Sequence, residues 1–342
     1  MFNLKPEAMK LAINLPKPQV YYLKLPALLL FVLTLITSCN TEDTYLDENA
    51  DLQRTIVEVL DSYGSESEGS DNESTQSRMN RPTFRTLNVA LARTGLAGTV
   101  SSNRLTVFAP TDAAFEKYGL NQRNIVSTLG VETLRSILLY HAVAGTVFSG
   151  DLPSNGFVAT LNGASVEVNV GSSVTINDAT VVIADIEARN GVIHAIDDVL
   201  FPPTQNLVEL ASSFDPEFSV LLAAAIKAEL AATLANDGPF TVFAPTNQAF
   251  MNLLGVNTVQ EAIDAVNGLA PEDLAPILLY HVVPGRVFST DLSSGPVETL
   301  NGSFDLDLET LTIDGNAMLV PSLLNVQATN GVIHVINSVL IP

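Results

Sequence analysis

Apolar and polar positions along the chain follow two different periods, and the two periods occupy different segments. Apolar residues and one histidine recur at helical spacing over residues 134–141 and again over 274–281, which predicts two amphipathic helices. Apolar and polar residues alternate one by one over 166–170 and over 304–309, which predicts half-buried antiparallel strands. Because helices precede strands in each half, the pattern predicts the α+β class.

A decapeptide at residues 106–115 is repeated with few changes at 241–250. Its apolar half suits a buried strand, and the following proline ends the strand because proline has no N–H to donate. The threonine after that proline can cap a helix. Asp112 comes next, where the positive helix end favours an anion, but the second copy has Asn247 instead. We therefore interpret the decapeptide as a structural corner and not as the holder of a carboxylate.

Two more motifs are repeated at a nearly constant distance. A Tyr-His pair at 140–141 recurs at 280–281, and an Asn-Gly-Val-Ile-His segment at 190–194 recurs at 330–334. The offset is 135 residues for the decapeptide and 140 for these motifs, which predicts two duplicated domains. Asn-Gly pairs are strong hairpin signals, so each segment is expected to join two antiparallel strands.

The repeats also place the expected domain boundaries. We assign a signal segment to 1–38, an acidic tether to 39–51, a first domain to 52–202 and a second to 203–342. Aligning Thr55 with Gln205 gives an offset of 150, against 134 for Phe84 and Phe218, so the first copy is 16 residues longer. We assign the excess to an acidic, serine-rich insertion at about 62–80, a composition that cannot bury enough apolar surface to fold.

The N-terminal segment has the features of a secretion signal. Lysines precede an uncharged run of 13 residues from Leu25 to Thr37, whereas a membrane span needs about 20. The sequence at 35–39 resembles the lipobox of bacterial lipoproteins, which predicts lipidation of Cys39. The alternative for a lone cysteine is a small buried hydrophobe. The length of the segment leaves Met1 and Met9 as alternative starts.

Charge and motif content exclude several functional classes. The chain has 16 basic and 37 acidic residues, a net charge of −21, which repels nucleic acid and anionic lipid. A single cysteine excludes intramolecular disulfides and multi-cysteine zinc sites. G-x-S-x-G, H-E-x-x-H and phosphate-loop motifs do not occur. The sequence therefore assigns no catalytic, cofactor-binding or metal-binding residue.

Four histidines and three strand carboxylates are the remaining candidates for chemistry. Each domain has two histidines, which could ligate a metal or act as acid and base, but they lie on apolar faces, which favours core histidines that donate to backbone carbonyls. Asp305, Asp307 and Glu309 could recruit calcium. A straight strand supplies too few oxygens for a tight calcium site, so a solvated face is favoured.

Together, the repeated motifs resemble those of fasciclin domains, from about Leu52 to the end of the chain. The resemblance implies two tandem modules, each a wedge of mixed and antiparallel strands with packed helices, used in extracellular adhesion and not for a shared enzymatic reaction. An Asp-Ile pair tied to integrin contact in animal members is kept at Asp185-Ile186 and lost at Asn325-Val326. We do not transfer that function.

The residues that match the family motifs are interpreted as structural. They are Thr111, Asp112, Tyr140, His141, Asn190, Gly191 and His194 in the first domain, and Thr246, Asn247, Tyr280, His281, Asn330, Gly331 and His334 in the second.

The combined prediction is a cell-envelope protein anchored by lipid at Cys39 in the outer membrane. The sequence leaves open whether it is exposed at the cell surface or faces the periplasm. Its two modules would bind an unidentified extracellular protein or polysaccharide, and no nucleic acid. Two alternatives are a metal-dependent or enzymatic role of the paired histidines and a purely structural spacer in the envelope. Adhesion surfaces have no spacing code, so the sequence names no ligand.

Overall fold

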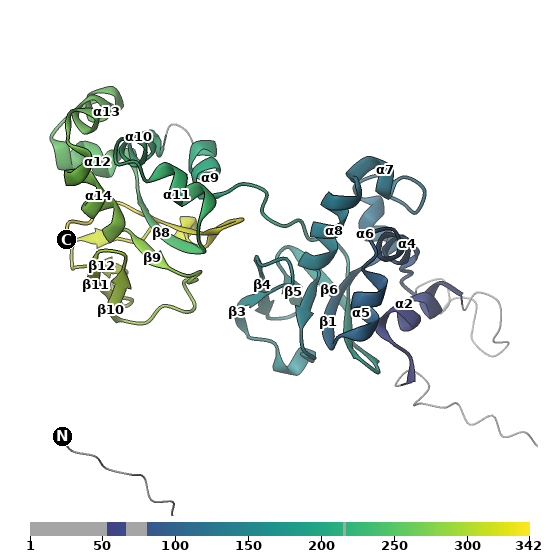
Figure 1. Cartoon of the computed structure of the whole chain (residues 1–342). Coiled ribbons are helices and arrows are strands. Elements are labelled where there is room, and N and C mark those ends of the chain that lie inside the picture. The colour runs from purple at the N-terminus through teal and green to yellow at the C-terminus, as the bar shows by residue number, and fades with distance from the viewer. Residues whose placement is uncertain (1–52, 66–80, 215–216) are drawn as a thin grey trace, which may run out of the picture. The chain divides into compact units, whose positions relative to one another are not determined.

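The computed structural model describes residues 53–65, 81–214 and 217–342 (Figure 1). The predicted signal, the lipobox with Cys39 and the acidic tether lie outside these ranges, as does most of the predicted insertion. Among the described residues, no helix combines the length and the apolar character that a membrane crossing requires. We call the described residues up to Pro202 the first domain and those from Pro203 onward the second domain.

The first domain alternates short helices with strands. Its helices are α2 (Ile56–Ser65), α4 (Arg85–Arg93), α5 (Ala97–Ser102), α6 (Asp112–Glu116), α7 (Ile125–Leu129) and α8 (Val131–Tyr140), with a 3₁₀ turn at Ser149–Asp151. Its strands are β1 (Leu105–Pro110), β2 (Ala142–Ala144), β3 (Asn155–Ala159), β4 (Ser165–Val170), β5 (Val174–Ile176), β6 (Ala179–Ala188) and β7 (Gly191–Ile196).

The seven strands form one sheet in the order β2-β1-β7-β6-β5-β4-β3. The central pair, β1 and β7, is parallel, and the other neighbours are antiparallel. The sheet is therefore mixed. All six residues of β1 and of β7 are buried, because helices pack on one face and β3, β4 and β5 fold over the other. Strands that are covered on both faces read as continuous apolar runs, which is the pattern of the decapeptide.

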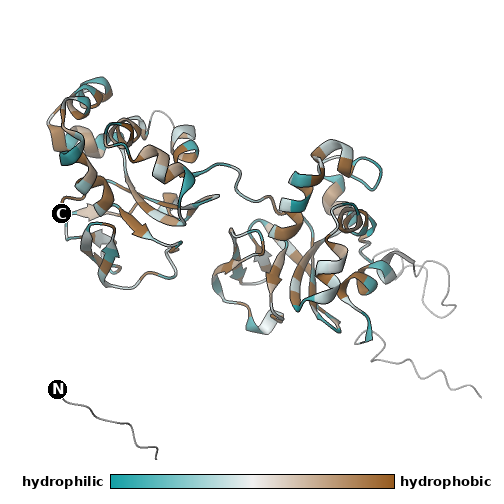
Figure 2. Cartoon of the chain, in the orientation of Figure 1, coloured by the Kyte–Doolittle hydropathy of each residue, from teal (hydrophilic) through white to brown (hydrophobic). Residues whose placement is uncertain are grey.

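The second domain repeats this arrangement. Its helices are α9 (Leu207–Ser213), α10 (Ser219–Lys227), α11 (Ala231–Asn236), α12 (Asn247–Leu254), α13 (Val259–Gly268) and α14 (Pro271–Tyr280). Its strands are β8 (Phe240–Pro245), β9 (Val282–Pro284), β10 (Gly295–Thr299), β11 (Gly302–Asp307), β12 (Thr312–Ile313), β13 (Ala317–Met318), β14 (Val326–Ala328) and β15 (Gly331–Ile336). Figure 2 shows apolar residues on its central strands and inner helix faces.

The two sheets differ at one strand. The first domain has the continuous ten-residue β6, whereas in the second a 3₁₀ turn at Pro321–Leu323 separates β13 from β14. The sheet is consequently divided into β10-β11-β12-β13 and β14-β15-β8-β9. Proline cannot donate to a strand ladder, which accounts for the interruption.

Two expected boundaries need correction. Residues 62–65 belong to α2 and not to the insertion, because Tyr63 extends the apolar face of the helix and packs its ring on Phe84 at a centroid distance of 5.6 Å. The strand expected over 304–309 ends at Asp307, whose carboxylate accepts hydrogen bonds from the backbone of Glu309 and the hydroxyl of Thr310, both at 2.8 Å. A side-chain turn therefore ends the strand there.

Candidate functional site

The repeated decapeptide forms the predicted corner in both domains. The hydroxyl of Thr111 accepts a hydrogen bond from the backbone of Ala114 at 3.2 Å, and Thr246 caps α12 through Ala249 at the same distance. Each threonine is extended and its helix begins at the next residue. The cap that the sequence predicts is therefore present twice.

Asp112 lies in the first turn of α6, as expected, but its carboxylate is hydrogen-bonded to a different helix. Its carboxylate accepts from the backbone of Thr86 at 2.8 Å, in the first turn of α4, and from the hydroxyl of Thr83. Asn247 accepts in the same way from the backbone of Val220, at 2.9 Å, in the first turn of α10. One acceptor oxygen is sufficient to cap a helix, so Asp and Asn are both tolerated. No local pattern could reveal this contact, because its partners lie more than 25 residues away.

The paired tyrosines connect a helix end to a strand. Tyr140 donates its hydroxyl hydrogen to the carbonyl of Ser165 at 2.8 Å and accepts from the amide of Asn177 at 3.2 Å. Burial raises its pKa. Tyr280 makes the equivalent contact with the Ser303 carbonyl, at 2.9 Å, but lies 3.1 Å from the carboxylate of Asp314. Burial and this carboxylate both raise the pKa of Tyr280.

His141 and His281 end helices α8 and α14 and are buried. In His141, Nδ1 lies 2.8 Å from the Ile137 carbonyl and Nε2 lies 3.0 Å from the backbone N–H of Leu200. A carbonyl only accepts and an N–H only donates, so the ring is neutral and carries its hydrogen on Nδ1. His281 repeats both contacts. Burial lowers the pKa of each ring to about 4.

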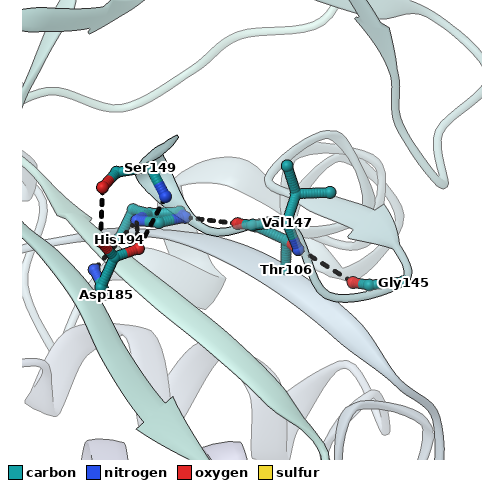
Figure 3. A network of polar contacts seen from close by, with 6 residues as sticks. All are labelled: Thr106, Gly145, Val147, Ser149, Asp185 and His194. Atoms are coloured by element: carbon teal, nitrogen blue, oxygen red, sulfur yellow. Dashed lines mark hydrogen bonds and ion pairs between the residues drawn. The ribbon is translucent and has the colours of Figure 1, made fainter. Parts of the chain in front are cut away.

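His194 and His334 adopt the opposite tautomer. Figure 3 shows that Nε2 of His194 contacts the Val147 carbonyl, at 2.9 Å, while Nδ1 faces the backbone N–H of Asp185, at 3.2 Å. The same reasoning places the hydrogen on Nε2. His334 is bound identically, and burial lowers the pKa of both rings.

The first residue of the Asp-Ile pair, Asp185, and its counterpart Asn325 serve the same network. Asp185 and Asn325 are both left-handed, with φ of 59°. The Asp185 carboxylate accepts from the backbone of Ser149 at 2.7 Å and from the Ser149 hydroxyl, as Figure 3 shows. The side-chain oxygen of Asn325 accepts from the backbone N–H of Ser289 at 2.7 Å, and its amide group donates to the Ser289 hydroxyl at 2.8 Å. The Asp185 carboxylate is thus used inside the domain.

Thr106 completes this network at the first strand. Its hydroxyl donates to the Gly145 carbonyl at 3.0 Å and accepts from the backbone of Val147 at 2.8 Å (Figure 3). Thr241 makes both contacts in the second domain. The loop after β2 is therefore fastened to β1 by a threonine, to β7 by a histidine and to β6 by Asp185. Sequence reasoning missed the roles of Thr106 and Ser149, since neither motif spacing nor chemistry marks them.

Asn190 and Asn330 do more than form a turn. The side chain of Asn190 accepts from the backbone of Ile56, at 2.9 Å, and donates to two carbonyls at the end of α5. Asn330 accepts from the backbone of Leu207 at 2.9 Å and donates at the end of α11. Each asparagine thereby joins the first helix of its domain to the last hairpin.

This pairing corrects the alignment of the two copies by one residue. Ile56 and Leu207 occupy equivalent places, so Thr55 corresponds to Asn206, at an offset of 151, and not to Gln205. Both residues act as caps, Thr55 with Glu58 and Asn206 with Glu209. The first copy is therefore 17 residues longer and not 16.

Gly191 and Gly331 are required by the close approach of β1 or β8. A Cβ atom would lie 1.8 Å from the Leu105 carbonyl oxygen at Gly191 and 2.2 Å from that of Phe240 at Gly331. No side chain can be placed there without moving the central strand pair.

The arrangement is suited to holding the fold and not to proton transfer. In all four histidines, both ring nitrogens face backbone groups, so none is oriented towards a substrate. In the part of the chain that the structure describes, no three His, Cys, Asp or Glu side chains converge on a possible metal site.

Comparison with known proteins gives the same family from independent evidence. The model of the fasciclin domain family matches residues 82–202 and 216–342. The chain is 32% identical over 247 residues to the transforming growth factor-beta-induced protein ig-h3 of Sus scrofa, which covers 69% of this chain and 34% of that protein. It is 38% identical over 130 residues to the immunogenic protein MPB70 of Mycobacterium bovis, which covers 36% of this chain and 66% of that protein.

A solved pair of FAS1 domains from the insect cell adhesion molecule fasciclin I aligns with 75% of this chain and 96% of its own, at 21% identity and a TM-score of 0.35. The chain spans about a third of the length of ig-h3. One domain model thus matches two segments of the chain, and each matched segment contains one copy of the repeated motifs. The chain belongs to the fasciclin domain family and contains two fasciclin domains in tandem.

Proposed function

We propose that this protein is a lipid-anchored protein of the cell envelope that presents two fasciclin domains outside the cell for adhesion or for binding of an extracellular ligand. The observation that supports the proposal most directly is the order of its parts. A secretion-type segment ends at a single cysteine in a lipobox-like sequence, and two domains of an adhesion-related family follow.

The site geometry supports a binding role in preference to catalysis. Every repeated polar motif residue described above is engaged in contacts within its own domain, so binding falls to the outer surfaces. Equivalent positions of the inner networks make the same backbone contacts in both domains, although Asp and Asn replace one another. A non-enzymatic role is therefore part of the proposal.

Surface accessibility tests the proposal. Whole cells that produce the protein are treated with external protease and blotted beside cells that produce a Cys39→Ala form. We expect the wild-type protein to be degraded on intact cells and the variant to move to the soluble fraction. Protection of the wild type in intact cells would place it on the inner side of the envelope and refute the adhesion role. A variant that stays in the membrane fraction would refute the anchor.

A further inference from the structure

Two half-exposed aromatic rings lie side by side on the first domain, outside the motif network. Tyr118 follows α6, and Phe201 follows β7. Their side chains are 48% and 44% exposed, and the rings pack edge to face with centroids 5.0 Å apart and planes inclined at 78°. Two large apolar groups in this contact form a small platform with a defined orientation.

Hydrogen bonds fix the platform and give it a polar rim. The hydroxyl of Tyr118 donates to Asp198 at 2.8 Å, and Lys117 donates to the other oxygen of that carboxylate at 3.1 Å. Although desolvation acts to raise the pKa of Asp198, the hydrogen bonds from Tyr118, the Val199 backbone and Lys117 outweigh it and hold the pKa below its ordinary value. The platform is therefore ordered before any ligand arrives, which reduces the entropy cost of binding.

The second domain has none of this chemistry at the equivalent positions. At the motif offsets of 135 and 140 residues, Leu253 replaces Tyr118 and Ile341 replaces Phe201, while Asn252 and Ser338 replace the charged pair. Leu253 and Ile341 are 50% and 53% exposed. Both domains thus expose two apolar side chains here, but only the first offers aromatic rings with a charged rim.

From this platform we infer that the first domain binds a neutral polysaccharide, with a sugar ring stacked on Tyr118 or Phe201 and its hydroxyl groups bonded to Asp198 and Lys117. The C–H groups on one side of a sugar ring carry slight positive charge, which the negative face of an aromatic ring attracts. The Asp198 carboxylate has acceptor capacity beyond its present bonds. This inference names the ligand class within the proposed function and rests on it.

Size and charge distinguish this ligand from the other candidates. A stable protein interface buries about 800 Å² on each partner, far more than two rings provide. Nucleic acid bases also stack on aromatic rings, but their phosphates need a basic groove. Here the net charge is −21, and the one adjacent lysine is paired with Asp198. The same charge disfavours acidic polysaccharides.

Affinity electrophoresis tests the inference on the purified Cys39→Ala chain. Gels contain one of four neutral polysaccharides (a β-glucan, a xylan, a mannan or an α-glucan), or pectate, or no polymer. We expect at least one neutral polymer to retard the chain. In a Tyr118→Leu/Phe201→Ile variant, which carries the residues of the second domain, the apparent affinity should fall about tenfold or more.

A Leu253→Ala/Ile341→Ala variant is the matched control, because it removes exposed apolar surface from the second domain, and it should be retarded like the parent. Both variants change exposed side chains, and equal melting temperatures would verify their folding. The inference is overturned if no neutral polymer retards the chain, if pectate alone does so, or if the aromatic variant is retarded as strongly as the parent. Because the assay needs no membrane, its result is independent of the anchoring and accessibility experiment.

Discussion

The first and second domains use one hydrogen-bond framework with different chemical groups. Where the first domain has Asp185, the second has Asn325, and both bind a serine backbone N–H at 2.7 Å. Where the first has Asn177 beside its tyrosine, the second has Asp314, and both accept a hydrogen bond from a strand backbone N–H at 2.8 Å. The comparison teaches that the position of an acceptor oxygen is preserved, whereas charge is free to vary. Substitutions that exchange residues between the domains test this conclusion.

The largest effect is expected at the glycines that both domains share. Gly191→Ala and Gly331→Ala should each destabilise their domain by more than about 3 kcal/mol, because the new Cβ collides with a carbonyl oxygen of the central strand. Chemical denaturation with hydrogen exchange as the readout measures the change in the free energy of unfolding of each domain. Gly98→Ala in α5 is the control, since nothing lies within 4 Å of its Cβ, and it should be neutral or slightly stabilising. A neutral Gly191→Ala would contradict the central strand geometry.

Acidification should weaken both domains in parallel through His141 and His281. Their pKa of about 4 in the folded state lies below the ordinary 6.5, so the unfolded chain binds protons that the folded chain does not. The stabilisation is complete above pH 6.5 and is lost as the pH falls towards 4, by about 3 kcal/mol for each histidine.

Melting curves between pH 7.5 and pH 4 test this pH dependence. A His141→Gln variant should flatten the curve of the first domain and leave that of the second unchanged. If the variant and the parent lose stability equally with acid, His141 is not the titrating group.

Exchanging the residue beside the tyrosine should lower the stability of the first domain and raise that of the second. Asn177→Asp places an acceptor opposite the Tyr140 hydroxyl, whose only hydrogen already goes to the Ser165 carbonyl, and should cost about 1–2 kcal/mol. Asp314→Asn supplies the missing donor to Tyr280 and should stabilise the second domain by about 1 kcal/mol. Urea unfolding of both variants checks the signs. Equal signs would show that the two environments are not interchangeable.

The smallest effect is expected from exchanging the acid and the amide at the loop clamp. Asp185→Asn should change the free energy of unfolding by no more than about 0.5 kcal/mol at pH 7, since Asn325 makes the same backbone contact. Asp185→Ala removes the acceptor and should cost about 2 kcal/mol. A large loss in Asp185→Asn would mean that charge, and not acceptor position, holds the clamp.

Much of the fold was predictable because its signals are local. The caps at Thr111 and Thr246 and the Asn-Gly hairpins depend on residues within a few positions of one another, and duplication made them recognisable. Pro321 is also a local signal, because a proline favours an interruption of the second domain's counterpart of the long strand β6.

The rest depended on contacts between distant residues. Asp112 binds a helix that begins 27 residues earlier, and Asp185 binds Ser149 across 36 residues. Contacts over such separations produce no periodic pattern in the sequence. The one-residue error in aligning Thr55 had the same origin, because the bond that reveals the correct alignment joins Ile56 to Asn190, 134 residues away.

The two asparagine ties also bear on the order in which the domains can form. Ile56 and Asn190 are 134 residues apart, and Leu207 and Asn330 are 123 apart. The parallel neighbour of β1 is likewise one of the last strands of its domain. A chain that emerges from its N-terminus first can pair β1 with β2, but it must leave the other edge of β1 and the first N–H of α2 unbonded until Asn190 and β7 have appeared. Each domain should consequently fold late and slowly, as a single cooperative unit. Its long-range contacts, which carry the entropy cost of loop closure, can form only after its last strand has been synthesised.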